Sequence, residues 1–581
     1  MTDQRESTAA APEAPAATIP GLEDWQHWTL VMGRAQQMLM EAWADGLAKD
    51  GAIGKAAVAD PLPLLTAGAE AWSKGLEAWG QMLTGFAKAG ETKDRRFSAA
   101  EWRDNPVFDT IRQSYLAISD QLLGTVDKIE GLDESARQRL KFGTKSFVDA
   151  MSPSNFALTN PEVMKRTIDT RGENLLNGLR NMLSDIKAGQ MSQSKAGAFE
   201  LGRNLAMTPG KVIYETRLFQ LIHYAPATGT VLKTPLVVFP PWINRFYILD
   251  LTPEKSFVKW CVDQGVSLFM VSWKSADESL ADVMLDDYVA AQVEAVDVIR
   301  EQLGVKSVHT IGYCVAGTTL TATLALLAAR GEADKIASAT FFTAQVDFEK
   351  AGDLTLFLGD ETMGLLGQLT TETGFLDGRY MAATFNLLRG RDLIWSYVVN
   401  NYLMGQEPAP FDLLHWNGDT TNLPAGWHRD YLDTLYRQNL LVKAGAITVD
   451  GTPIDLSKIA TPAYIQAGRE DHIAPPESVW RLMDHLSGPK RFVLAGSGHI
   501  AGVVNPPAAG KYQYWTHDGE AASLEAFTTG ATEHKGSWWP DWIEWLRGQT
   551  PETVKADGSR VPGQGKHKAI EDAPGRYVKS R

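Results

Sequence analysis

The stretch VHTIGYCVAG, residues 308–317, decides the fold. Its first part, Val308–Ile311, is short and rich in β-branched residues, which is typical of a strand. A helical pattern follows from Thr318 to Arg330. Cys314 therefore stands where a strand turns directly into a helix, the place of the nucleophile in a Gly-x-Ser-x-Gly elbow, with cysteine replacing serine. The positive end of the helix dipole favours a thiolate there.

Small residues flank Cys314, and the elbow gives a reason for them. The turn is sharp, so side chains two positions before and after the nucleophile would collide with the neighbouring strand and helix. Gly312 meets this requirement, Ala316 stands where glycine is usual, and Gly317 follows it. The backbone N–H of Val315 is the predicted first donor of an oxyanion hole. A single cysteine at such a junction is more often a small core residue, so the assignment depends on its partners.

Short apolar runs and helical stretches alternate on both sides of this elbow, which indicates a mostly parallel sheet with crossover helices. Two runs near its start are expected to form a hairpin. The chain is therefore predicted to contain an α/β-hydrolase fold. The predicted strands are Val212–Tyr214, Leu218–Tyr224, Leu236–Phe239, Leu268–Trp273, Val308–Ile311, Ala337–Phe342, Ala463–Ala467 and Phe492–Leu494, and Val293–Leu303 is a predicted helix.

The fold predicts where the partners of Cys314 lie. The nucleophile, the acid and the histidine should follow one another along the chain, each at a strand end. Asp471 and His499 stand in loops directly after two predicted strands, in that order. Glu470 and Asp347 are rival acids that rank below Asp471, and His472 is a rival base on the same tight loop.

A second oxyanion donor should come from the loop after an earlier strand. The segment PPWIN, residues 240–244, follows the strand Leu236–Phe239. The backbone N–H of either Ile243 or Asn244 is the predicted donor, and the sequence does not decide between them.

The chain divides into four parts by composition. Residues 1–20 are small and Pro-rich and are expected to be disordered. Residues 21–205 show helical spacing and form a predicted helical N-terminal domain, in which Trp25 and Trp28 are either core or an exposed apolar face. Residues 206–550 form the predicted catalytic domain, with a lid inserted at about 345–460. Residues 551–581 are a polar tail that is ordered only if something holds it.

Composition narrows the class of protein. The formal net charge of −14 makes nucleic acid an unlikely ligand. The two cysteines, Cys261 and Cys314, cannot form a disulfide framework or a Cys-rich zinc site, and no cofactor or metal is expected. No apolar run has the length of a membrane span and no secretory signal pattern is seen, so the cytoplasm is the expected location.

Several segments resemble the polyhydroxyalkanoate synthases, which polymerise 3-hydroxyacyl-CoA into polyester granules. The resemblance covers about residues 100–550, and Ala316 departs from its usual glycine. The matching segments are SPSNF (152–156), TNPE (159–162), PPWIN (240–244), YILDL (247–251), FNLLR (385–389), NYL (401–403), WNGD (416–419), EDHI (470–473) and SGHIAGV (497–503).

The resemblance implies an acyltransferase with a catalytic triad of Cys314, Asp471 and His499. It implies a single-subunit enzyme that prefers short acyl groups such as 3-hydroxybutyryl and releases CoA. It also implies a homodimer attached to polyester granules in the cytoplasm, in contact with granule-coating proteins. Two other functions are consistent with the same residues. One is a thioesterase or polyester depolymerase, and the other is an inactive granule scaffold.

Overall fold

The computed structural model of the chain describes residues 94–371 and 373–580. The predicted disordered terminus and the helical pattern around Trp25 and Trp28 lie outside the described residues. The chain divides into two compact units, Met1–Lys165 and Arg166–Arg581. The domain ranges predicted from composition stay predictions.

The described part of the first unit is helical. Asn105 caps the longest helix through its side chain, which accepts a hydrogen bond from Val107, and Pro106 occupies the first turn, where its missing N–H costs nothing. Asp133 caps the next helix by accepting from the N–H of Ala136. The elements are η1 (Arg95–Phe97), α4 (Glu101–Asp104), α5 (Pro106–Val126), α6 (Glu134–Ala150), η2 (Pro153–Asn155) and the start of α7 (Pro161–Asp169).

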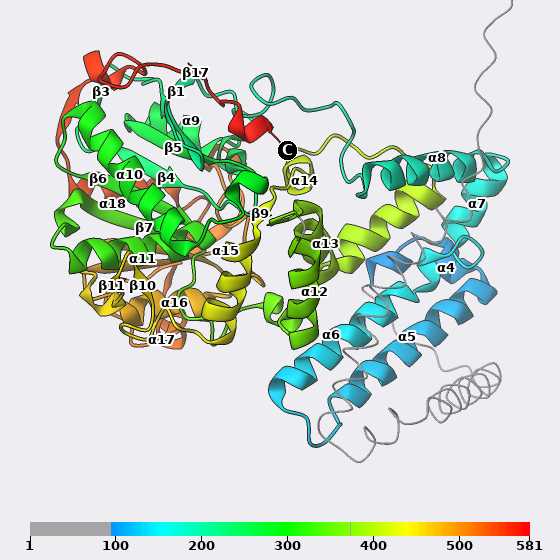
Figure 1. The fold of residues 1–581 in the computed structure, drawn as a ribbon. Helices are drawn as coiled ribbons and strands as arrows, with labels where there is room; N and C mark the ends of the chain where they lie inside the picture. Colours follow the sequence, from blue (N-terminus) through cyan, green and yellow to red (C-terminus); the bar gives the residue numbers. More distant parts are fainter. Residues whose placement is uncertain (1–93, 372, 581) are drawn as a thin grey trace, which may run out of the picture. The chain divides into compact units, whose positions relative to one another are not determined.

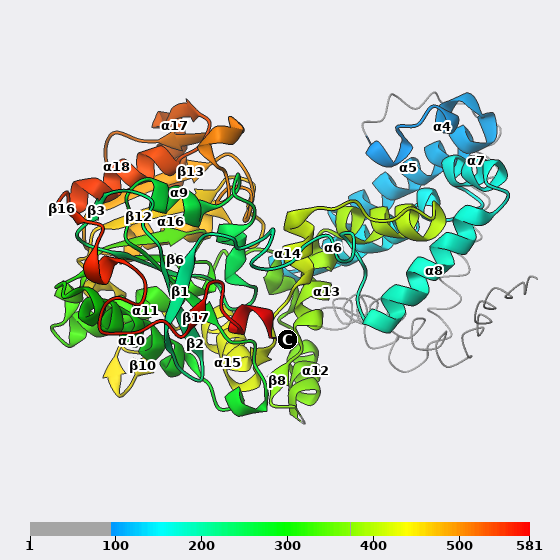
Figure 2. The ribbon, with the colours of Figure 1, turned by 90° about the horizontal axis from the view of Figure 1, so that it is seen from above.

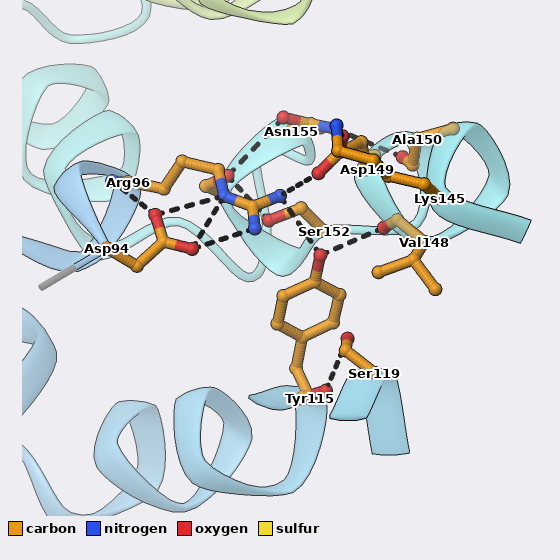
Figure 3. A network of polar contacts seen from close by, with 11 residues as sticks. Asp94, Arg96, Tyr115, Ser119, Lys145, Val148, Asp149, Ala150, Ser152 and Asn155 are labelled. Atoms are coloured by element: carbon orange, nitrogen blue, oxygen red, sulfur yellow. Dashed lines mark hydrogen bonds and ion pairs between the residues drawn. The ribbon is translucent and has the colours of Figure 1, made fainter. Parts of the chain in front are cut away.

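A polar network centred on Arg96 joins these helices (Figure 3). The Arg96 guanidinium donates to Tyr115 Oη at 3.0 Å and to Asp149 Oδ1 at 3.1 Å, and it also binds Asp94. Tyr115 donates onward to the carbonyl of Val148 at 2.9 Å. The network therefore links α5 to the end of α6 through hydrogen bonds in which most members are half-buried.

The segment SPSNF has a structural role at the end of α6 (Figure 3). Asn155 Nδ2 donates to the carbonyls of Asp149 and Ala150 at 2.8 and 3.1 Å. The Ser152 and Ser154 hydroxyls are hydrogen-bonded at 2.8 Å. Helix ends leave carbonyls without partners, so this buried turn satisfies the last turn of α6.

Within the described residues, the second unit is built on one eleven-stranded sheet with the order β15-β14-β13-β12-β7-β6-β4-β5-β2-β1-β17 (Figures 1 and 2). The central strands from β5 to β13 run parallel, and the flanking strands are antiparallel. The strands are β1 (Gly210–Glu215), β2 (Phe219–Tyr224), β4 (Leu236–Phe239), β5 (Leu268–Trp273), β6 (Val308–Tyr313), β7 (Ile336–Phe342), β12 (Ala463–Gly468), β13 (Lys490–Ala495), β14 (Gln513–Thr516), β15 (Thr532–Lys535) and β17 (Glu571–Asp572). The predicted hairpin is the antiparallel pair of β1 and β2.

Side chains alternate across the sheet and fill two cores. In β5, Phe269 and Val271 enter one core and Leu268 and Met270 enter the other, as a period of two requires. The first core is covered by α10 (Leu285–Leu303), α11 (Val315–Ala329) and α16 (Pro476–His485). The second is covered by α9 (Phe257–Asp263) and α18 (Trp539–Gln549), on the opposite side of the sheet (Figure 2).

Two helices begin earlier than their sequence pattern predicts. Helix α10 begins at Leu285 rather than Val293, and its first turn carries Asp286 and Asp287, which suit the positive end of the dipole. Helix α11 begins at Val315, directly after Cys314, rather than at Thr318.

The insert, residues 343–462, joins β7 to β12, two strands that are neighbours in the sheet. Three of its segments are π-helical: Arg391–Trp395, Val398–Leu403 and Tyr431–Arg437. Helix α8 (Glu173–Ala188) packs on η8 (Val398–Leu403). Asn174 Nδ2 at the start of α8 donates to the Leu403 carbonyl at 2.8 Å. Further elements are η6 (Asp353–Phe357), α12 (Asp360–Thr371), β8 (Phe375–Leu376), α13 (Gly378–Leu388), η7 (Arg391–Trp395), α14 (Asp412–Gly418), β9 (Leu423–Pro424), α15 (Ala425–Asp430), η9 (Tyr431–Arg437), β10 (Thr448–Val449), β11 (Thr452–Pro453) and η10 (Leu456–Lys458).

The C-terminal tail is held along the sheet. Strand β16 (Thr553–Lys555) pairs with β3 (Thr230–Leu232), and β17 adds to the edge of β1. Arg560 is buried and donates to the carbonyl of Lys233 at 2.7 Å. These contacts supply the anchoring that a polar tail needs in order to be fixed.

Three buried histidines should make the folded state sensitive to acid. Burial lowers the pKa of His223 to about 3 and the pKa values of His309 and His428 to about 4. An unfolded histidine binds a proton near pH 6.5, while the folded site stays neutral, so protons favour unfolding below that pH. We expect each histidine to contribute stability that is complete above about pH 7 and falls by on the order of 3 kcal/mol by pH 4.

The variant His309→Gln isolates one such contribution. His309 lies between two hydroxyls, with Nδ1 2.7 Å from Ser338 Oγ and Nε2 2.7 Å from Thr550 Oγ1. Glutamine has no proton to gain, so the free energy of unfolding from urea titrations should fall less between pH 7.5 and pH 5 than it does in the wild type. Equal falls in both proteins would contradict a neutral His309 in the folded state.

Candidate active site

Cys314 occupies a strained elbow between β6 and α11. Its backbone dihedrals are φ 53° and ψ −127°, in the positive-φ region that non-glycine residues rarely adopt. Its N–H donates to the carbonyl of Phe342 at 2.9 Å, and its carbonyl accepts from Gly317 at 2.8 Å. These two hydrogen bonds keep the backbone of Cys314 in its strained conformation. The side chain remains partly exposed.

Gly312 and Gly317 make the elbow possible. A Cβ on Gly312 would lie 2.5 Å from the Cα of Gly317, and a Cβ on Gly317 would lie 2.4 Å from the Cβ of Ala344. The close approach therefore uses the glycine three positions after the nucleophile. Ala316 is fully buried beside it, and its carbonyl accepts from Gln292 Nε2 at 3.1 Å.

We expect Gly317→Ala to destabilise the chain by about 1–3 kcal/mol, because overpacking of a close backbone contact forces the neighbouring strand or helix to move. Thermal or urea unfolding measures the change. Gly548→Ala is the matched control, since Gly548 is an exposed glycine of α18 whose added Cβ would meet nothing within 4 Å. It should leave stability unchanged or raise it by about 0.5–1 kcal/mol.

Asp471 and His499 meet above the carboxyl ends of β12 and β13. Asp471 Oδ2 lies 2.7 Å from His499 Nδ1. The other carboxylate oxygen, Oδ1, accepts from the backbone N–H groups of Ile473 and Ala474 at 2.8 and 2.9 Å. The Asp471 side chain is fully buried, so these bonds fix both its position and the orientation of the imidazole ring.

The imidazole of His499 carries the electrostatic signature of a paired base. Burial by itself lowers its pKa, but the charges of Asp471 and Cys314 and hydrogen bonds to both side chains outweigh burial and raise the pKa well above its usual value. Tyr313 donates from its hydroxyl to the carbonyl of His499 at 3.1 Å, which helps to position this loop. His499 therefore lies between an acid and the thiol.

The rival residues have other surroundings. Glu470 is exposed, whereas Asp471 is buried. Asp347 accepts from Asn439 Nδ2 at 2.8 Å and pairs with Arg481 and His485. Burial lowers the pKa of His472, and its carbonyl accepts from the N–H of Asp353 at 2.9 Å. None of these three makes the contact with His499 Nδ1 that Asp471 makes.

The predicted oxyanion donors stand directly after Cys314 and after β4, the strand that neighbours β6 in the sheet. Among the residues that the structure describes, the N–H of Val315 has no hydrogen-bond acceptor, although Val315 is buried. The segment 240–244 follows β4 as predicted, and its Asn244 backbone forms an antiparallel bridge with Thr420 of the insert. Trp242 anchors this segment by stacking on Tyr288 with ring centroids 3.8 Å apart. The choice of Ile243 or Asn244 as second donor stays a prediction.

The structure adds residues that sequence reasoning missed. Tyr431 and Tyr436 of η9 are buried close to Cys314: burial raises both pKa values, and the charge of Cys314 adds to each shift. Gln345 Nε2 donates to Tyr436 Oη at 3.0 Å, and Gln345 is held by Ser478. An aromatic pair at i and i+5 carries no local signal, so only the fold of the insert places it beside the thiol.

The assembled groups can perform nucleophilic acyl transfer. A thiol, a base and an orienting carboxylate stand in order, with a free N–H beside the thiol. Within residues 94–371 and 373–580, no cluster of three His, Cys, Asp or Glu residues could hold a metal ion. No helix in that part of the chain is long and apolar enough to cross a membrane.

Two family profiles match the chain. The profile described as the poly-beta-hydroxybutyrate polymerase (PhaC) N-terminus matches residues 93–261. The profile of the alpha/beta hydrolase fold matches residues 268–506 and confirms the predicted fold.

Curated relatives match most of the chain. A poly(3-hydroxyalkanoate) polymerase subunit PhaC of Rhizobium meliloti is 45% identical over 84% of this chain and 80% of its own length. A poly(3-hydroxyalkanoate) polymerase of Methylorubrum extorquens is 45% identical over 84% of this chain and 81% of its own. The poly(3-hydroxyalkanoate) polymerase subunit PhaC of Cupriavidus necator is 44% identical over 87% of this chain and 86% of its own length. The chain belongs to the poly(3-hydroxyalkanoate) polymerase family.

Proposed function

We propose that the chain polymerises (R)-3-hydroxyacyl-CoA into polyhydroxyalkanoate with release of CoA, through an acyl thioester on Cys314. The family supports the reaction. One structural observation supports the mechanism: the strained elbow holds Cys314 beside a histidine whose other ring nitrogen lies 2.7 Å from Asp471.

Acylation of Cys314 is the first step. The sulfur attacks the thioester carbonyl, and His499 holds the proton that leaves the thiol. The N–H of Val315 and that of Ile243 or Asn244 stabilise the oxyanion, and each donor contributes on the order of 3 kcal/mol. The C–S bond to CoA then breaks, and His499 protonates the departing thiolate. One thioester replaces another, so the step is nearly balanced in free energy.

Elongation is the second step. A hydroxyl of another hydroxyacyl unit or of the growing chain attacks the acyl group on Cys314, and His499 takes its proton. The C–S bond to Cys314 then breaks, and His499 returns the proton to the departing thiolate. The thioester becomes an oxygen ester, which drives the reaction forward. Water is the competing acceptor, and the insert that buries Tyr431 and Tyr436 beside the thiol is suited to exclude it.

The proposal extends to the setting of the reaction. The chain needs no second type of subunit and no cofactor, and it forms a homodimer. It prefers short acyl groups such as 3-hydroxybutyryl. It works in the cytoplasm on the surface of polyester granules, where granule-coating proteins are its neighbours.

Incubation of the purified chain with 3-hydroxybutyryl-CoA tests the function. Release of free CoA together with insoluble polyester is the expected result, and a series of acyl lengths gives the preference. Free CoA with soluble monomeric acid would show a thioesterase, and degradation of added polyester would show a depolymerase. No CoA release with any acyl length would leave the granule-scaffold function.

A further inference from the structure

Arg245 directly follows the segment 240–244, and its charge is buried. Its side chain is 1% exposed, and its Nε lies 3.0 Å from Oδ1 of Asp419 in the insert. Tyr247 donates to the other carboxylate oxygen of Asp419 at 2.9 Å. A guanidinium in such a place needs acceptors for all its N–H groups, because a buried donor without one is costly.

The end of the chain supplies acceptors for the two terminal nitrogens, whereas Nε makes an ion pair with Asp419 but no aligned hydrogen bond. Arg245 Nη1 donates to the carbonyl of Val578 at 2.9 Å, and Nη2 donates to the carbonyl of Ser580 at 2.9 Å. Nη2 also reaches the carbonyl of Thr420 at 3.3 Å. The planar fork of arginine thus joins three stretches that are far apart in sequence, and lysine could not satisfy the same geometry.

The same stretch of insert holds the backbone of segment 240–244. Trp416 Nε1 donates to the carbonyl of Arg245 at 2.7 Å, and Thr421 Oγ1 donates to the carbonyl of Trp242 at 2.5 Å. The bridge between Asn244 and Thr420 lies between these two bonds. The position of the Ile243 and Asn244 N–H groups therefore depends on where residues 416–421 are held.

The chain end is itself anchored on the sheet. Tyr577 Oη donates to the carbonyl of Thr216 at 2.7 Å, and the N–H of Tyr577 donates to Gln220 Oε1 at 3.2 Å. Val578 is 2% exposed and packs in the second core. Its carbonyl is thus a fixed acceptor, placed by β2 and the turn before it rather than by the insert.

We propose that Arg245, Asp419 and residues 577–580 form a latch that sets the backbone of Ile243 and Asn244, and with it the second oxyanion donor. Arg245 is a positioning residue, since it acts through the segment it follows and does not touch the thiol. The latch rests on the proposed function only in that a thioester carbonyl is attacked at Cys314. The chain end is then part of the active-site scaffold.

Three variants test the latch: Arg245→Lys, Asp419→Asn and a chain ending at Tyr577. With 3-hydroxybutyryl-CoA, each should lower kcat for CoA release about 10–100-fold, the effect of a displaced oxyanion donor, with KM changed by less than about threefold. Alkylation of Cys314 by iodoacetamide should keep its wild-type rate, because this reaction needs the thiol but no oxyanion hole. Arg245→Lys combined with the truncation should be no worse than either alone.

Arg576→Gln is the matched control. Arg576 lies in the same tail and pairs with Glu215 and Glu571, but it does not touch Arg245. Its loss should leave kcat within about twofold, since exposed ion pairs contribute little. The latch is overturned if the three variants keep wild-type kcat, or if alkylation slows in parallel with CoA release. CoA release measures acyl transfer to a hydroxyl and to water alike. If the wild-type chain releases CoA but makes no polymer, the polymerase function is wrong, and the latch can still be tested by the same assay.

Discussion

Cys314→Ala is expected to abolish CoA release from 3-hydroxybutyryl-CoA while the fold stays intact. Without the thiol no acyl-enzyme can form, and the remaining groups give only residual catalysis, about 10⁶-fold below the wild type. Side-chain loss at this partly exposed position removes little packing. Intact-mass measurement should show one acyl group on the wild type after brief mixing with substrate, and none on the variant.

Cys261→Ala is the control, because the chain has only these two cysteines. Cys261 is fully buried in the second core, and burial raises its pKa well above the usual value, so it is a poor nucleophile. Its replacement should keep the acyl adduct, and it leaves the elbow unchanged. An acyl group found on the Cys314→Ala protein would remove Cys314 from the mechanism.

Asp471→Asn should lower kcat about 10³–10⁴-fold with little change in KM, a loss of the size seen when the acid of a serine-protease triad is made an amide. An amide nitrogen facing His499 Nδ1 would select the tautomer that carries its proton on Nε2 and cannot accept the thiol proton. The charge that raises the pKa of His499 is also lost, so that pKa should fall toward its ordinary value. Steady-state CoA release over a range of pH measures both effects.

Glu470→Gln is the control for this experiment. Glu470 neighbours Asp471 but is exposed, and the partner of His499 Nδ1 is Asp471. Its replacement should leave kcat within about twofold. A larger loss of kcat in Glu470→Gln than in Asp471→Asn would show that Glu470, and not Asp471, is the acid.

The sign of the His499 contribution to folding follows from its raised pKa. The folded site binds a proton more tightly than the unfolded chain does, so its stabilisation is complete below about pH 6.5 and is lost as pH rises through the folded pKa. This dependence is opposite to that of His309, whose lowered pKa removes stability in acid. The two histidines are thus separable by their pH windows.

The sequence was sufficient for the parts of this molecule that depend on local pattern. Buried parallel strands are continuous apolar runs, and Leu236–Phe239 and Leu268–Trp273 have the bounds that pattern predicts. The sequence also predicted that Cys314, Asp471 and His499 each stand directly after a strand, because the strands before them have clear patterns. Helix starts were predicted less accurately: the first turn of α10 carries Asp286 and Asp287, although Leu285, Tyr288 and Val289 already follow the helical period and are buried.

The rest depends on contacts between distant segments. Strand β17 is Glu571–Asp572, and nothing in two acidic residues indicates pairing with β1. Tyr431 reaches Cys314 only through the path of the insert. Arg245 could be any surface arginine until the fold buries it against Asp419 and the chain end.

The adjacency of β7 and β12 has a consequence for the newly made chain. Strand β7 can pair with β6 early, but its other edge must wait until residues 343–462 and β12 have been synthesised. At about 5–20 residues per second, that apolar edge stays unpaired for on the order of ten seconds. Unpaired edges recruit strands from other chains. Faults in expression are therefore expected to begin at β7, through association of half-made chains rather than through instability of the finished enzyme.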